Sequence, residues 1–206
     1  MKKLVLLLTL ALSAAPPPAR AQTTQPPTAA APPAGAAVRV EAPKFVPEAI
    51  AALSLRDLEG RDFRLADLRG RVYVLNLWAT WCGPCRAEIP GFNKVFEDYA
   101  ARGVEFVGLT VEDPEQDAER VRDFAREVGV KYRLGWLGKE TAREMTSWGS
   151  TRTGRFVIPQ TFVVAADGRI VLHVRGYNPR VPEMIREGVE RALKAAPAAG
   201  AAPARP

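Results

Sequence analysis

Apolar residues in this chain form two patterns. Uninterrupted apolar runs alternate along its central part with segments in which apolar residues recur at helical periodicity. Residues 71–79 (RVYVLNLWA) are almost entirely apolar or β-favouring, which predicts a strand buried on both faces. After Cys85 the apolar positions recur at helical spacing, which predicts one face of a helix that ends at Gly103. Pro90 lies inside this helix and is expected to bend it, because proline lacks an amide donor and clashes with the preceding turn.

The same alternation continues through the rest of the domain. Residues 53–70 contain two short alternating runs around Glu59 and Gly60, which predicts a β-hairpin. Asp167 and Gly168, the pair that tight two-residue turns prefer, predict a hairpin between the last two strands. The other expected elements are strands at 104–111 and 131–137, helices ending at Gly129 and spanning 139–149, and a helix at 178–196. Strands that alternate with helices predict an α/β fold, in which helices flank a central sheet.

The N-terminus has the pattern of a signal peptide. Lys2 and Lys3 precede an apolar run over residues 4–15, and the small residues Ala19 and Ala21 suit a cleavage site after Ala21. This run of 12 residues is shorter than the ~20 that a helix needs to span a bilayer, with an uncleaved membrane anchor as the alternative. Residues 1–21 therefore predict export to the periplasm or another extracytoplasmic compartment, where disulfides form and persist.

Composition divides the remainder of the chain into three segments. Residues 22–43 are rich in Pro and Ala with few large apolar side chains, which predicts a flexible, partly extended linker. Residues 196–206 have the same character and are expected to be a disordered tail. The segment 44–195 between them has the usual length of one domain.

Basic and acidic residues nearly balance once the signal peptide is removed. The chain holds 29 Lys and Arg against 23 Asp and Glu, and Lys2, Lys3 and Arg20 leave with residues 1–21, so 26 basic residues give a balance of +3. The charges are interspersed, as in EDPEQDAERVRDFAREVG, which is typical of solvated helix faces. A nucleic-acid-binding surface would need clustered basic residues, so no nucleic-acid partner is expected. The chain is expected to be a monomer.

The two cysteines of the chain, Cys82 and Cys85, lie between the strand at 71–79 and the helix that follows it. A helix N-terminus presents unpaired N–H groups and the positive end of the helix dipole, which favours a thiolate. In Cys-X-X-Cys sites the cysteine pKa falls from about 8.5 to as low as ~3.5. Cys82 is therefore expected to be the exposed attacking sulfur, and Cys85 to resolve a mixed disulfide from within the helix.

A structural disulfide and a metal site are the alternatives to a redox pair. A disulfide across so short a loop gives little chain-entropy stabilisation. Structural zinc takes about four ligands, usually Cys or His, and the single histidine, His173, lies in an alternating strand where it is expected to face solvent or a neighbouring residue. A zinc site shared between two chains stays open, but no metal or other cofactor is expected beyond the redox-active cysteine pair.

The stretch WATWCGPCRAEIP, residues 78–90, resembles the active-site region of thioredoxin-fold oxidoreductases. With the preceding residues 58–77 it is similar to the exported TlpA and ResA type, a branch that includes cytochrome c maturation thioredoxins. The resemblance covers residues 45–194. It implies a thioredoxin-like fold, in which a central mixed sheet is flanked by helices and extended by an N-terminal β-hairpin.

The resemblance also implies roles for individual residues. Cys82 takes the nucleophile position and Cys85 the resolving position. Pro159 matches the family proline whose preceding peptide bond is cis and which lies against the cysteine pair. The backbone of Ile158 would pair with an extended substrate segment by strand addition. The implied substrate-binding residues are Trp81, Gly83, Pro84, Ile158 and Pro159.

Two positions depart from the family pattern. Thioredoxin proper keeps a buried aspartate six residues before its first cysteine, where this chain has Asn76. Glu88 is a candidate replacement as a proton-transfer group, with a first-turn carboxylate favoured by the helix dipole as the alternative. Gln160 stands where many relatives have threonine, a change expected to affect the substrate groove.

These patterns predict an exported thiol–disulfide oxidoreductase that reduces protein disulfides. The sequence does not name the substrate: apocytochrome c, an oxidase assembly factor and a general periplasmic disulfide pool all suit it. The resemblance implies the reducing direction and a membrane-embedded thiol reductant as the electron donor. One alternative is a thiol peroxidase, whose pattern has threonine three residues before the reactive cysteine, where this chain has Ala79 and Thr80 is one position off. The other is a non-enzymatic metallochaperone, which on this fold resembles a wider cysteine spacing with a well-placed histidine.

Overall fold

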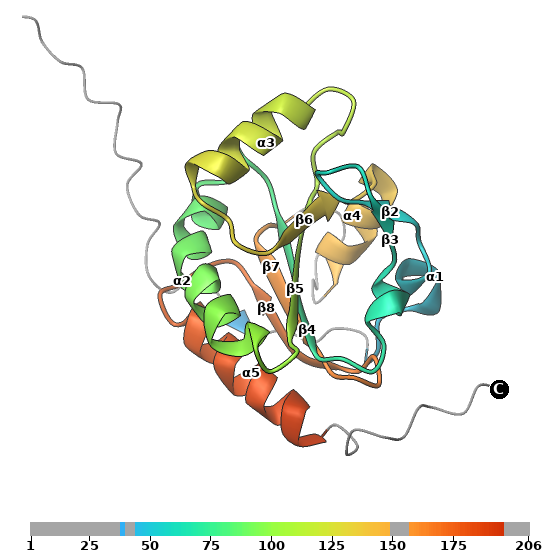
Figure 1. Cartoon of the computed structure of the whole chain (residues 1–206), viewed down its shortest axis with the longest axis vertical. Coiled ribbons are helices and arrows are strands. Elements are labelled where there is room, and N and C mark those ends of the chain that lie inside the picture. The colour runs from blue at the N-terminus through green and yellow to red at the C-terminus, as the bar shows by residue number, and fades with distance from the viewer. Residues whose placement is uncertain (1–37, 40–43, 149–156, 196–206) are drawn as a thin grey trace, which may run out of the picture.

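A six-stranded mixed sheet organises the chain in the computed structural model, which describes residues 38–39, 44–148 and 157–195 (Figure 1). The strand order is β1-β8-β7-β4-β5-β6. Strand β4 pairs in parallel with β5, which pairs in parallel with β6, whereas β7, β8 and β1 join by antiparallel pairing. The strands are β1 (Val38–Arg39), β4 (Tyr73–Trp78), β5 (Glu105–Thr110), β6 (Arg133–Trp136), β7 (Gln160–Val164) and β8 (Ile170–Arg175).

Strand β4 lies at the centre of the sheet and all its residues are buried. Because successive strand side chains point to opposite faces, β4 contributes to two separate cores. Val74 and Trp78 belong to one core, and Leu75 and Leu77 to the other. The continuous apolar run at 71–79 is thus explained, and the predicted strand buried on both faces is confirmed.

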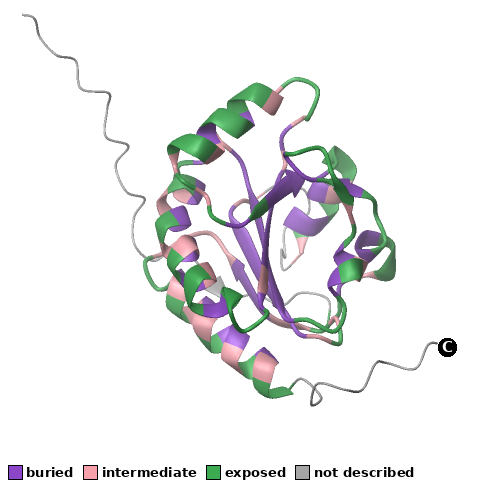
Figure 2. Ribbon diagram, viewed as in Figure 1, coloured by how far each residue is buried: buried purple, intermediate pink, exposed green. Residues whose placement is uncertain are grey.

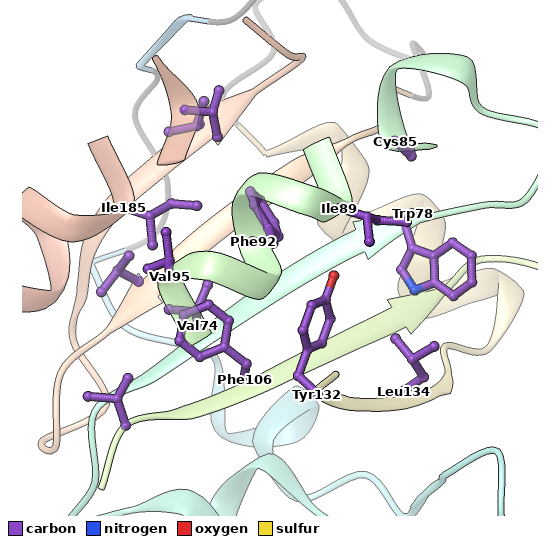
Figure 3. Packing of buried hydrophobic residues seen from close by; sticks show 14 of the residues in the cluster. Val74, Trp78, Cys85, Ile89, Phe92, Val95, Phe106, Tyr132, Leu134 and Ile185 are labelled. Atoms are coloured by element: carbon purple, nitrogen blue, oxygen red, sulfur yellow. The ribbon is translucent and has the colours of Figure 1, made fainter. Parts of the chain in front are cut away.

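Helices cover both faces of the sheet, so the strands form the buried centre of the molecule (Figures 1 and 2). On one face, Phe92, Val95 and Ile185 pack over Val74 (Figure 3). The helices on this face are α2 (Gly83–Ala100), α3 (Ala118–Glu127) and α5 (Val181–Ala195). The opposite face carries the shorter elements α1 (Glu48–Ala51), the 3₁₀ helix η1 (Leu65–Leu68) and α4 (Lys139–Ser147). This arrangement confirms the expected mixed sheet flanked by helices.

The predicted N-terminal hairpin is present as a separate two-stranded sheet of β2 (Leu55–Arg56) and β3 (Asp62–Phe63). The second strand, β3, is shorter than the alternating pattern over residues 53–70 had predicted. Residues 65–68 form the helix η1, which buries Leu65 and Leu68 in the core beneath α1 and α4. Leu65 and Leu68 are three positions apart and lie on one side of a 3₁₀ helix, whereas in a strand they would point to opposite faces, so burying both favours the helix.

The hairpin between β7 and β8 has a wider turn than the predicted two-residue one. The backbone N–H of Ala165 donates to Arg169 O at 2.8 Å, which leaves three residues in the loop. Gly168 has φ +85°, a left-handed conformation that glycine adopts without steric cost. Three-residue loops with a left-handed last residue are a common hairpin type and also suit an Asp-Gly sequence.

Residues 38 and 39, within the segment expected to be a linker, form the edge strand β1 against β8. The predicted signal peptide at 1–21, the rest of the predicted linker up to residue 43, and the predicted tail at 196–206 lie outside the described residues. In the part of the chain that the structure describes, no helix is both long and apolar enough to cross a membrane.

Candidate functional site

The two cysteines lie where the chain leaves β4 and enters α2. Cys82 is the N-cap residue of α2, and the helix begins with Gly83 and Pro84, where a missing amide donor costs nothing. A disulfide joins Cys82 to Cys85 with an S–S distance of 2.12 Å and a Cα–Cα distance of 5.2 Å. The backbone N–H of Cys85 donates to Cys82 Sγ at 3.2 Å, so this sulfur receives one of the unpaired donors at the helix start.

The residues around the disulfide differ greatly in their exposure to solvent. Trp81 is 63% exposed, whereas Cys82 is only 6% exposed and Cys85 is completely buried. The expectation of an exposed Cys82 is therefore wrong for the disulfide form, because its sulfur is bonded inward to the buried Cys85. Of the two cysteines, Cys82 is nevertheless the one nearer to solvent.

The Ile158–Pro159 peptide bond is cis, as expected from the resemblance. Pro159 is buried, Ile158 is half-buried, and Pro159 O accepts a hydrogen bond from Gly176 N. In the antiparallel register of β4 and β7, Leu77 pairs with Gln160. Pro159 therefore lies at the end of β4 from which the cysteine loop leaves, although 77 residues separate it from Cys82 in the sequence.

Glu88 is buried in the core and is not a solvated first-turn carboxylate. It lies three residues after Cys85, so both side chains are on the same face of α2. Asn76 Nδ2 donates to Glu88 Oε1 at 2.8 Å and to Thr161 Oγ1 at 3.1 Å, while Glu88 Oε2 has no hydrogen-bond partner among the described residues. Burial raises the pKa of Glu88 well above its ordinary value, and the bond from Asn76 offsets this only in part.

Gln160 and His173 form a second buried polar group, on the opposite face of the sheet. Gln160 Nε2 donates to the carbonyls of Thr146 and Val157, and its Oε1 accepts from His173 Nε2 at 2.7 Å. His173 also stacks on Phe162 with ring centroids 4.2 Å apart. Burial lowers the pKa of His173 to about 3, so the ring is neutral. Its expected position facing a neighbour is correct, and solvent exposure is not.

Sequence reasoning missed one residue of the site, Glu112, which follows the end of β5. Its buried carboxylate accepts hydrogen bonds from the backbone N–H and the hydroxyl of Thr80, two residues before Cys82. The available signal was an acidic residue directly after a buried apolar strand, a common location for functional side chains in α/β folds. Across the described residues, no three His, Cys, Asp or Glu side chains are grouped so that they could hold a metal ion.

The disulfide at the start of α2 and the cis-proline before β7 lie at the same end of two neighbouring inner strands, β4 and β7, of a mixed sheet flanked by helices. This combination of fold and site defines the class of thioredoxin-fold thiol–disulfide oxidoreductases, and the chain is a member of that class.

Comparison with known proteins gives the family. The chain belongs to the AhpC/TSA family, which it matches over residues 41–173. It is 30% identical to thiol-disulfide oxidoreductase ResA of Bacillus thuringiensis (strain Al Hakam) over 154 residues, 75% of each chain. It is 31% identical to the thiol:disulfide interchange protein HelX of Rhodobacter capsulatus over 165 residues, 76% of this chain and 85% of HelX.

Solved structures agree with this assignment. The crystal structure of a thiol:disulfide interchange protein of the thioredoxin family from Chlorobium tepidum TLS is similar to the chain with a TM-score of 0.57. The two are 31% identical, and the similarity covers 68% of this chain and 92% of that protein. The family expected from the sequence is therefore confirmed, as is the oxidoreductase activity class.

Proposed function

We propose that the chain is an exported reductase of protein disulfides, with Cys82 as the nucleophile and Cys85 as the resolving residue. The observation that carries this proposal is the asymmetry of the pair, in which one sulfur lies near solvent at a helix N-terminus and the other is fully buried. In the reduced protein, the Cys82 thiolate attacks one sulfur of a substrate disulfide and releases the other as a thiolate, which takes up a proton. The Cys85 thiolate then attacks Cys82 Sγ and releases the second substrate thiolate.

The net reaction moves two electrons from the Cys82–Cys85 dithiol to the substrate and leaves the intramolecular disulfide. The helix N-terminus favours this chemistry because its free N–H groups and dipole stabilise a thiolate at Cys82. The backbone N–H of Cys85, which donates to Cys82 Sγ, is one of these groups.

Glu88 is the proposed proton acceptor for Cys85, whose thiol must ionise before it can attack. A carboxyl group with a raised pKa suits this task, because proton transfer near neutral pH is most effective when donor and acceptor have similar pKa values. Asn76 holds Oε1 of Glu88 and leaves Oε2 without a partner among the described residues. The carboxylate that thioredoxin proper carries on the central strand is thus supplied here from the helix.

The proposed substrate surface consists of the exposed Trp81, the helix start and the loop before β7. Trp81 offers a large apolar contact next to Cys82. The backbone of Ile158, just before the cis-proline, is the proposed partner of an extended segment of the substrate. The proposed surface residues are Trp81, Gly83, Pro84, Ile158 and Pro159.

Export, substrate and electron donor complete the proposal. The sequence pattern of residues 1–21 supports export, and the similarity to ResA and HelX supports a role in thiol–disulfide exchange on proteins. Apocytochrome c and oxidase assembly factors are the proposed substrates, and a membrane-embedded thiol reductant is the proposed donor that reduces the pair again.

The test is to trap the substrate and to measure the direction of electron flow. Cys85→Ser should accumulate a mixed disulfide at Cys82, and Cys82→Ser/Cys85→Ser should accumulate none. A reduction potential near −270 mV, like that of thioredoxin, supports the reductase, whereas one near −120 mV makes the protein an oxidant. Rapid peroxide consumption that disappears in Cys82→Ser would instead support the thiol peroxidase.

A further inference from the structure

Glu112 is a buried carboxylate that the proposed exchange reaction does not use. Its side chain is 2% exposed and accepts hydrogen bonds from four donors. Burying an ionised carboxylate is costly unless it is paired and hydrogen-bonded. Hydrogen bonds to both oxygens compensate for the burial of the Glu112 carboxylate. These bonds also link parts of the chain that are far apart in the sequence.

Two of the four donors belong to Thr80, which lies in the loop between β4 and the cysteines. The backbone N–H of Thr80 donates to Glu112 Oε2 at 2.8 Å, and its hydroxyl donates to Oε1 at 2.6 Å. Just before Thr80, Trp78 O accepts from Val111 N at 3.0 Å, and Ala79 O accepts from Cys82 N at 3.2 Å in a turn that spans Thr80. Glu112 thus holds the middle of the loop that places Cys82.

The other two donors fix Glu112 itself. Thr110 Oγ1 donates to Oε2 at 2.9 Å, and Arg120 Nη2 donates to Oε1 at 2.8 Å. The same Arg120 nitrogen also pairs with Asp117 at 2.8 Å, at the start of α3. The loop before Cys82 is therefore tied to the end of β5 and to α3 through one carboxylate.

Two residues of this connection, Thr80 and Arg120, also line a surface groove. The groove runs between the cysteine loop and α3 and is lined in part by Thr80, Trp81, Arg86, Arg120 and Phe124. Trp81 lies between Thr80 and Cys82, so the position of Thr80 sets the position of both the exposed indole and the nucleophile. A shift of the loop would change how a protein substrate meets the site without removing either cysteine.

We propose that Glu112 is a positioning residue for thiol–disulfide exchange, holding Thr80 so that Trp81 and Cys82 are presented together to a protein disulfide. This inference rests on the proposed reductase function. The inference predicts different effects on two kinds of substrate. A protein disulfide needs Trp81 and the Cys82 sulfur correctly placed relative to each other, whereas a small disulfide needs only access to the sulfur.

Glu112→Gln is the variant that tests the connection. Glutamine replaces one acceptor oxygen by an NH₂ group, so in one orientation a donor faces the Thr80 N–H and in the other it faces Arg120. Pre-reduced wild type and variant are each mixed with insulin and with oxidised glutathione, and the single-turnover rates are compared. Misplacement by about 1 Å can cost on the order of 100-fold in rate, so the insulin rate should fall by about 10- to 100-fold while the glutathione rate stays unchanged.

Asp57→Asn is the matched control, because Asp57 is also a buried carboxylate that accepts from backbone and side-chain donors. Its partners are Glu59 N, Arg61 N and the Arg61 side chain in the β2–β3 hairpin, away from the cysteine loop. This variant should lower the thermal midpoint and leave both rates as in the wild type. Thr80→Val, which keeps the carboxylate and removes one bond to the loop, supplies the measurement if Glu112→Gln does not fold.

The outcomes separate the two proposals. Insulin and glutathione rates that fall equally, or that both match the wild type, would show that Glu112 has only a structural role. A wild-type protein that reduces glutathione but not insulin would overturn the protein-disulfide reductase itself, and the positioning role with it.

Discussion

The carboxyl group of Glu88 lies in the core, one turn after Cys85, with one oxygen bonded to Asn76 and the other unpartnered among the described residues. Position in the sequence favoured a different interpretation, a first-turn carboxylate stabilised by the helix dipole. Burial follows from the neighbours of α2, since Glu88 precedes Ile89 and lies on the same helical face as Cys85 and Phe92. If Glu88 is the proposed proton acceptor of Cys85, substituting it changes both the stability of the protein and the rate of the resolution step.

Glu88→Gln should therefore change the pH dependence of stability in a defined direction. The folded protein holds the Glu88 proton to a higher pH than the unfolded chain does, because burial raises the pKa of the carboxyl group. Its contribution to stability is full below the ordinary pKa of about 4.3 and is lost as pH rises towards the raised value. The variant lacks this loss of stability. Its thermal midpoint should therefore rise relative to that of the wild type as pH increases from 4 to 8.

The same variant should slow the resolution step. General acid–base groups typically contribute about 100- to 10,000-fold in rate, so release of the substrate from the mixed disulfide should slow by at least about 100-fold. Stopped-flow measurement of insulin reduction at pH 7 checks this. A difference in thermal midpoint between variant and wild type that stays the same at every pH would contradict the buried location of Glu88. An unchanged release rate would contradict its role in proton transfer.

Gln160→Thr should destabilise the protein. The shorter side chain leaves the His173 Nε2–H and the carbonyls of Thr146 and Val157 without their partner in the core. An unsatisfied buried polar group costs about 1–3 kcal/mol, so the free energy of unfolding should fall by at least that amount. Urea titration measures the change, and a variant as stable as the wild type would mean that water replaces the amide.

At the scale of elements, the β4–α2 connection defines the site, and α2 is held in place by α5. Gly91 of α2 lies so close to α5 that an added Cβ atom would be 2.5 Å from Pro182 Cγ. Helix α5 begins at Val181, 98 residues after α2 begins at Gly83, so local sequence gives no sign of this contact. A glycine inside a helix normally weakens it, and close packing is the physical reason to keep one here.

Gly91→Ala should consequently lower stability, against the usual gain from alanine in a helix. Overpacking typically costs about 1–3 kcal/mol, which exceeds the about 1 kcal/mol of helix propensity gained. Pro182→Ala removes the ring, so the double variant should recover most of the loss in a urea-denaturation double-mutant cycle. Additive effects of the two substitutions would contradict the close contact.

The elements themselves were largely predictable from the sequence, because their signals are local. The buried run of β4, the helical spacing of α2 and the glycine after it each lie within one stretch of chain. The errors concern short segments. The three-residue turn before β8 has the same Asp-Gly sequence as the predicted tight turn, so only register distinguishes the two. At η1, Leu68 departs from the alternation of the predicted strand and is buried together with Leu65.

At the scale of the whole molecule, the sheet divides the buried polar residues between two faces. Asn76, Glu88 and Thr161 lie on the α2 side, close to the resolving cysteine, whereas Gln160 and His173 lie on the α4 side. Since neighbouring residues of β7 point to opposite faces, Gln160 and Thr161 belong to different groups. The proposed proton acceptor is thereby separated from the buried histidine by the sheet itself.

The proposed export makes a prediction for the whole chain. Expressed with its own N-terminus in a bacterium with a periplasm, the protein should be recovered there as a chain that begins at Gln22, because the site after Ala21 suits signal peptidase. Intact-mass measurement of the purified protein checks the cleavage position. A full-length chain in the membrane fraction would instead indicate an uncleaved anchor.

By itself, the sequence determined the fold class, the cysteine pair and the family, because each depends on a contiguous motif or a local periodicity. Only the tertiary structure decided which carboxylates are buried and paired near the cysteines. Glu88 meets Asn76 across 12 positions and Glu112 meets Thr80 across 32, and both acids are buried because packing encloses them. Local pattern fixes what a segment becomes, but burial and pairing depend on residues that the folded sheet and helices bring together.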